Sequence, residues 1–79
     1  MKIVEVNKYI VADQQICHGK LTFKGTRIMV WQVLEMLESG ASVEEIIEEF
    51  PSLTKEHIKA ALSYAADITK GRNYVLVSV

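Results

Sequence analysis

The stretch from Ser42 to Pro51 most constrains the fold, because it marks both ends of one helix. Ser42 and Glu45 have the spacing of a capping box, in which each side chain accepts a hydrogen bond from the other residue's backbone N–H. Pro51 cannot continue a helix, since it has no amide hydrogen and its ring clashes with the preceding turn. Glutamates alternate with an apolar face made of Val43, Ile46, Ile47 and Phe50. We therefore predict a helix over 43–50.

Two more helices are predicted on either side of this one. The first begins at Val30 and ends before Gly40, with apolar residues at i, i+3, i+4 and i+7: Val30, Val33, Leu34 and Leu37. The other is capped by Thr54 and runs to about 67–70, with an inner stripe of Ile58, Ala61, Leu62 and Ala65. Two short helices joined by about four residues, after a helix that completes the core, are typical of helix-turn-helix units, although other three-helix units share the pattern.

Residues 1–28 lack helical periodicity and are rich in β-forming residues. They predict short strands near 3–6, 9–12, 15–17 and 21–23, and the β-branched tail 74–79 predicts a terminal strand. We thus expect a single α+β, mainly α domain over 1–79: strands and a hairpin in 1–28, a three-helix unit in 30–70 and a strand in 74–79.

The small size and the residue types limit what can stabilise this domain. Its 79 residues bury a marginal core, and the single cysteine, Cys17, cannot form an internal disulfide. Cys17, His18 and His57 are too few for a closed tetrahedral metal site, so we expect no metal and no cofactor. No apolar run reaches membrane-spanning length, which favours a cytoplasmic protein. Association into a homodimer, through strand pairing and cover for Trp31 or Met36, is the remaining way to bury apolar surface.

No enzymatic motif is present in the sequence. There is no nucleophile motif and no phosphate-binding glycine loop, and Cys17-His18 lacks a third group to orient the imidazole. His57, in the first turn of the third helix, is interpreted as a neutral surface histidine. We expect no enzyme active site.

The charges divide the chain into three zones. Residues 1–28 have a local balance of +3, residues 29–53 carry six glutamates and no basic residue, and residues 54–79 are basic again. The basic zones offer a candidate DNA-binding set: Lys20, Lys24 and Arg27 from the hairpin, with Lys55, Lys59 and Ser63 from one side of the third helix. The alternative is that these lysines only make the domain soluble, and that Arg27 instead ties the hairpin to the first helix through Glu35 or Glu38.

A second candidate set would bind a protein partner. Trp31 and Met36 are apolar residues outside the inner stripe of the first helix, where they are either extra core or interface anchors. The glutamates of the second helix provide an acidic surface, which by default is only a solvated helix face. The candidate partner-binding residues are Trp31, Met36, Glu44, Glu45, Glu48 and Glu49.

Residues 16–68 contain segments that are specific in combination. They are Ile16-Cys17-His18-Gly19-Lys20, Lys24-Gly25-Thr26-Arg27-Ile28-Met29-Val30, Leu37 to Ile46, and Pro51-Ser52-Leu53-Thr54 followed by Ala61-Leu62-Ser63-Tyr64-Ala65. In this order the chain resembles the family called domain of unknown function number 433. It departs from the family pattern at Leu21 and Met29, where proline is usual, and at His18, where glycine is common.

This resemblance implies a homeodomain-like helix-turn-helix protein of prokaryotes, often regarded as a VapB-type antitoxin encoded beside a PIN-like ribonuclease toxin. Three functions stay open: a DNA-binding antitoxin that regulates its own operon and neutralises the ribonuclease, a protein-interaction module without DNA binding, and an uncharacterised enzyme. A basic surface across the third helix and hairpin favours the first, and an exposed apolar patch without it favours the second.

Overall fold

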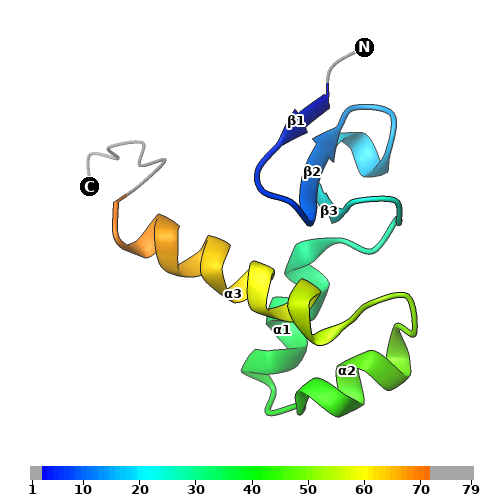
Figure 1. Ribbon diagram of the computed structural model, residues 1–79, viewed down its shortest axis with the longest axis vertical. Coiled ribbons are helices and arrows are strands. Elements are labelled where there is room, and N and C mark those ends of the chain that lie inside the picture. Colours follow the sequence, from blue (N-terminus) through cyan, green and yellow to red (C-terminus); the bar gives the residue numbers. More distant parts are fainter. Residues whose placement is uncertain (1–2, 72–79) are drawn as a thin grey trace.

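The chain forms a small antiparallel sheet followed by three helices, an α+β fold (Figure 1). The computed structural model describes residues 3–71. The elements, in chain order, are β1 (Ile3–Glu5), β2 (Ile10–Asp13), the 3₁₀ turn η1 (Cys17–Gly19), β3 (Leu21–Phe23), α1 (Val30–Glu38), α2 (Val43–Glu49) and α3 (Lys55–Thr69). All three helices begin and end within a few residues of the positions predicted from the sequence.

The sheet has the order β1-β2-β3 with antiparallel neighbours, so β2 is the central strand. Ile10 pairs with Phe23 on the face that looks toward the helices, and both side chains are fully buried. Val11 pairs with Thr22 on the opposite face, and these two are also buried, because the chain around η1 folds back against β2. The sheet is therefore covered on both faces where β2 pairs with β3, whereas the edge strand β1 is exposed.

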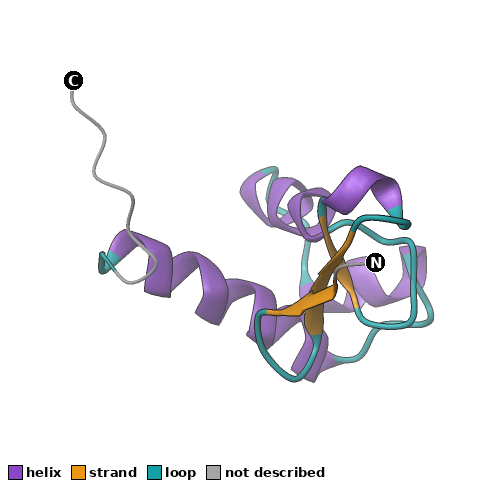
Figure 2. Cartoon of the chain, turned by 90° about the horizontal axis from the view of Figure 1, so that it is seen from above, coloured by secondary structure: helices purple, strands orange, loops and turns teal. Residues whose placement is uncertain are grey.

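The core lies where the three helices meet the sheet, as Figure 2 shows from above. Its buried members come from β2, β3, the three helices and the turn before α3: Ile10, Phe23, Val30, Val33, Ile46, Leu53, Ile58 and Ala61. Apart from the small Ala61, fully burying each of these side chains contributes about 1.5–3 kcal/mol. This one cluster accounts for the packing of α1, α2 and the first half of α3.

The predicted start of α2 and the predicted end of α1 are confirmed by their hydrogen bonds. The Glu45 N–H donates to Ser42 Oγ at 3.1 Å, and the Ser42 N–H donates to Glu45 Oε1 at 2.8 Å, which completes the capping box of α2. Gly40 has a φ of +97°, and the N–H of Ala41 bonds to the carbonyl of Met36 at 3.0 Å. This left-handed turn ends α1 and reverses the chain into α2.

The strand predicted near 15–17 is wrong. Cys17 and His18 have φ values of +52° and +58°, and with Gly19 they form the 3₁₀ turn η1. Left-handed backbone cannot continue a strand. The Cys17 Sγ lies 3.5 Å from the carbonyl oxygen of Arg27, so this turn is held against the loop before α1.

The inner stripe predicted for the third helix is wrong at Leu62. Ile58 and Ala61 are buried, but Leu62 is 49% exposed. The physical reason is visible in Figure 1, where the C-terminal half of α3 projects beyond the rest of the fold. The apolar stripe continues along the helix past the point where the core ends.

Two further expectations concern the terminal strand and membrane-spanning helices. The predicted strand 74–79 lies outside the described residues. Within residues 3–71, no helix has the length and apolar character that would let it cross a membrane.

Candidate functional site: an acidic groove between α1 and α2

An open groove with a volume of about 920 Å³ lies between α1 and α2. Its apolar part is provided by Trp31 and Met36 on α1, Ala41 in the turn and Phe50 at the end of α2. Its acidic part is provided by Glu35 on α1 and by Glu45, Glu48 and Glu49 on α2. The groove thus combines apolar side chains with four carboxylates.

The tight turn at Gly40 creates this groove. Because α1 ends at Glu38 and α2 begins at Val43, the chain reverses within four residues and sets the two helices side by side. Ser39 and Gly40 also line the groove and have little or no side chain to fill it. These two small residues therefore leave space at the turn end of the groove.

Trp31 is the most exposed aromatic side chain of the groove, at 49%. Its indole N–H donates to the Sδ of Met29 at 3.2 Å, which holds one edge of the ring. The Gln32 side-chain oxygen accepts the N–H of Met29 at 3.0 Å and fixes the start of α1. An exposed, oriented tryptophan beside carboxylates offers both apolar contact and a ring face for a cation.

The structure brings most of the predicted partner-binding residues together. Trp31, Met36, Glu45, Glu48 and Glu49 all line the groove, whereas Glu44 does not. Sequence reasoning missed Glu35 and Phe50. Glu35 stands one helical turn after Trp31, so the i, i+4 spacing was the signal that could have found it.

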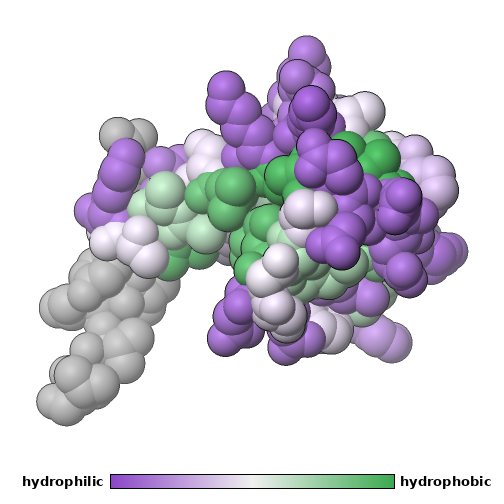
Figure 3. Space-filling model, turned by 90° about the horizontal axis from the view of Figure 1, so that it is seen from below, coloured by the Kyte–Doolittle hydropathy of each residue, from purple (hydrophilic) through white to green (hydrophobic). Residues whose placement is uncertain are grey.

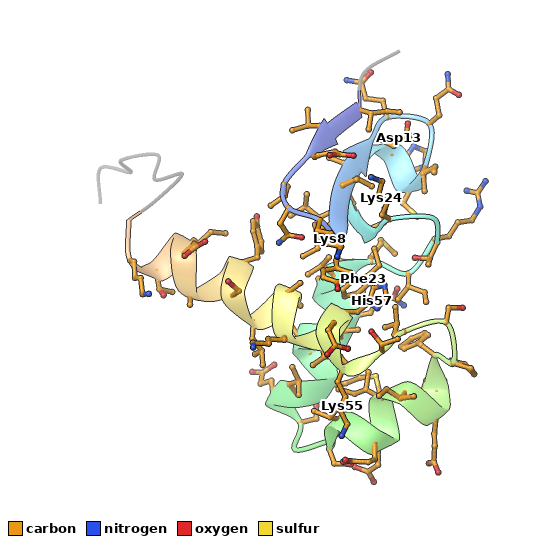
Figure 4. The ribbon with its side chains drawn as sticks, in the orientation of Figure 1. Lys8, Asp13, Phe23, Lys24, Lys55 and His57 are labelled. Carbon is orange, nitrogen blue, oxygen red and sulfur yellow. The ribbon has the colours of Figure 1, made fainter. Side chains whose placement is uncertain are left out.

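The predicted DNA-binding residues are spread over the surface. Lys55, Lys59 and Ser63 are exposed on α3, and Lys20, Lys24 and Arg27 are exposed on the hairpin side. Figure 4 shows Lys24 beside the strands and Lys55 beside α2, well separated along the long axis of the molecule. The Lys24 Nζ also lies 2.6 Å from Glu5 Oε2, so part of its charge is compensated within the chain.

A smaller pocket lies between α3 and the loop that joins β1 to β2. Its volume is about 310 Å³, and it is lined by Lys59 and Ser63 together with Asn7, Lys8, Tyr9, Glu56 and Ala60. Sequence reasoning missed Lys8, whose Nζ lies 5.6 Å from the centre of the Tyr9 ring. This pocket therefore places Lys8 near Lys59 and Ser63, two of the predicted DNA-binding residues.

His57 has a structural position that the sequence did not reveal. Its Nδ1 accepts the backbone N–H of Thr54 at 3.0 Å, so the imidazole caps α3. The ring packs edge-on against Tyr9 and Phe23, with centroid distances of 4.8 and 5.7 Å. His57 therefore belongs to the contact between sheet and helix and is not the surface histidine expected from the sequence.

Neither a metal-binding cluster nor the expected ion pair of Arg27 is found among residues 3–71. Within residues 3–71, no group of three or more His, Cys, Asp or Glu side chains is placed to hold a metal ion. Arg27 is exposed, and no ion pair joins it to another residue within 3–71. The predicted link from Arg27 to Glu35 or Glu38 is thus not formed.

These features define a small α+β domain with an acidic, apolar-lined groove between two of its three helices. The chain belongs to the family described as protein of unknown function (DUF433), whose model matches residues 10–65. That range includes β2, β3, α1, α2 and α3 as far as Ala65, and therefore the whole groove.

A curated relative extends over most of the chain. The uncharacterized protein y4eO of Sinorhizobium fredii (strain NBRC 101917 / NGR234) is 32% identical over 74 residues, which are 92% of this chain. The chain spans about a third (34%) of the length of that relative. No solved structure matches the chain.

Proposed function

We propose that this domain is a protein-interaction module whose α1–α2 groove binds a basic segment of a partner protein. The observation that carries this proposal is the convergence of Trp31, Met36 and Phe50 with four carboxylates in one groove. Apolar contact supplies affinity, and the carboxylates select cationic side chains and speed the encounter.

The family resemblance suggests which partner to test first. It implied a PIN-like ribonuclease encoded beside the chain, and the RNA-facing surface of such an enzyme is cationic. The glutamates of α2 would then act as an RNA mimic, and the chain would be the antitoxin of a toxin-antitoxin pair. The exposed Trp31 supports a protein partner of this kind, since oriented aromatic side chains are frequent interface anchors.

Trp31 also provides the assay, because it is the single tryptophan of the chain. The chain is titrated with the product of the neighbouring gene while Trp31 emission is recorded, and a blue shift with saturation is expected as the indole leaves water. Glu48→Lys and Glu49→Lys should each weaken binding about tenfold or more. Glu44→Lys is the matched control, since it reverses a charge on the same helix outside the groove. Equal effects of all three substitutions, or no complex, would refute the proposal.

A second candidate function is binding to double-stranded DNA through α3, as in a homeodomain-like helix-turn-helix protein. The observation that favours it is that Lys55, Lys59 and Ser63 are all exposed on the helix that follows α2 after a short turn. Replacing both lysines by alanine should weaken promoter binding for every sequence and flatten the logarithmic salt dependence by roughly 0.9 for each phosphate that is no longer neutralised. A wild-type chain without salt-sensitive binding at low ionic strength would exclude this function.

A further inference from the structure

The second half of α3 projects from the body with large apolar side chains exposed. We call residues 62–69 the α3 arm; at 1.5 Å per residue it is about 12 Å long. Tyr64 packs against the core, but Leu62 is 49% exposed and Ile68 is 39% exposed. Figure 3 shows apolar surface continuing from the body onto this projecting helix. Two turns of helix with so little packing are marginal in water, so a covering surface would stabilise the arm.

The arm cannot cover the acidic groove of its own chain. α3 is one uninterrupted helix from Lys55 to Thr69, and Ile58 and Ala61 hold its first half in the core. The arm must therefore keep the direction that the core gives it, which leads away from the rest of the fold (Figure 1). A covering surface has to come from another molecule.

The apolar face of the arm and the lysines that border it match the groove in apolar character and in charge. Within 62–69 the one charged residue is Asp67, but Lys59 stands one turn before Leu62 and Lys70 directly follows Thr69, and both lysines are exposed on the flank next to Leu62. The groove has an apolar part at Trp31, Met36 and Phe50 and carries Glu35, Glu45, Glu48 and Glu49. Opposite charges beside matched apolar surfaces are the pattern of a specific interface.

We propose that the α3 arm of one copy of this chain docks in the α1–α2 groove of a second copy, and that the reciprocal contact closes a two-fold homodimer. This interface covers Trp31 and Leu62, which are both 49% exposed in the single chain. A two-fold arrangement uses the same pair of surfaces twice and leaves neither free for further growth. The inference rests on the proposed function in one respect: it assigns that same groove a regulating occupant, which a basic partner must displace.

The dimer is tested with the chain alone, by sedimentation and Trp31 emission over 1–200 µM (the range set by the expectation of about micromolar affinity). We expect a dimer at high concentration, with emission shifting to the red as dilution releases Trp31. Leu62→Glu should raise the dissociation constant about 100-fold, because it places a carboxylate in an acidic groove and removes an apolar anchor. Leu62 is exposed in the single chain, so this variant is expected to keep its fold, which circular dichroism checks.

Gln14→Glu is the control, since it adds the same charge at an exposed position after β2, outside both the arm and the groove, and should leave the dimer unchanged. A wild-type monomer at 200 µM, a concentration about 100-fold above micromolar affinity, would overturn the inference. A dimer that persists in Leu62→Glu would also overturn it and would assign dimerisation to another surface, such as the exposed Val4 on the edge strand β1. If Leu62→Glu is a monomer that binds no basic partner, the dimer stands and the proposed function fails.

Discussion

Replacing His18 by glycine should stabilise the domain. His18 has φ +58° and ψ +30°, and a left-handed conformation costs a residue with a side chain about 1–2 kcal/mol. Glycine avoids that strain, but it loses more backbone entropy on folding, which lowers the free energy of unfolding by about 0.5–1 kcal/mol. The His18 side chain is exposed, so its removal costs little packing energy. The net expectation is a stabilisation of about 0.5–1 kcal/mol, which for a domain of this size raises the melting temperature by roughly 2–8 °C.

Thermal and urea unfolding of His18→Gly measure this effect, and Lys20→Gly is the matched control. Lys20 is also exposed and lies two residues further along, but its φ is −68°, so glycine relieves no strain there. The control should lose about 0.5–1 kcal/mol. If His18→Gly is destabilised as much as Lys20→Gly, the left-handed strain is absent and the reasoning is refuted.

Three further predictions concern stability. Thr22→Val should raise the free energy of unfolding by about 1–3 kcal/mol, because the Thr22 Oγ1 is buried without a hydrogen-bond partner and valine has nearly the same shape. An unchanged urea midpoint would contradict this prediction. Ser42→Ala should lower the melting temperature through a loss of about 1 kcal/mol at the α2 cap, and Ser52→Ala, at an exposed turn position, is the comparison. Arg27→Ala should leave the melting temperature within about 2 °C of the wild type, since the exposed guanidinium forms no ion pair; a large drop would restore the strut role.

The helices could be predicted from the sequence because their ends carry local chemistry. The Ser42 and Glu45 capping box, the Gly40 stop and the Pro51 break act within a few residues, and each has the predicted role in the structure. Such signals need no knowledge of the tertiary fold. The same holds for β3, which occupies the predicted residues 21–23.

The turn at Cys17 and His18 could not be predicted, because it depends on contacts far along the chain. Histidine is enriched among the non-glycine residues that adopt left-handed backbone, but such residues are rare, so this pair gives only a weak local signal. The turn is held by the packing of η1 against β2 and by the contact from Cys17 to the carbonyl of Arg27, ten residues away. A glycine at position 18, common in the family that the chain resembles, would have been the missing local signal.

The groove could be predicted only in part, because residue spacing gives helix faces but not the angle between helices. Trp31 and Met36 were identified as surplus apolar residues of α1, and Glu45, Glu48 and Glu49 as the outer face of α2. That these two sets meet depends on the four-residue turn between the helices. For the same reason the sequence could not separate Glu44, which lies outside the groove, from its neighbours.

The distribution of charge links the two proposed uses of the groove. A site that attracts a basic partner also attracts the lysine flank of α3 on a second copy, and both ligands need Trp31 uncovered. The apparent dissociation constant for a partner equals the intrinsic value divided by the fraction of free grooves, so it doubles at the chain concentration where half of the grooves hold an arm. The apparent affinity of the wild type for a partner should therefore fall as the chain concentration rises. For Leu62→Glu the apparent dissociation constant should not depend on chain concentration, because the arm of that variant does not dock in the groove.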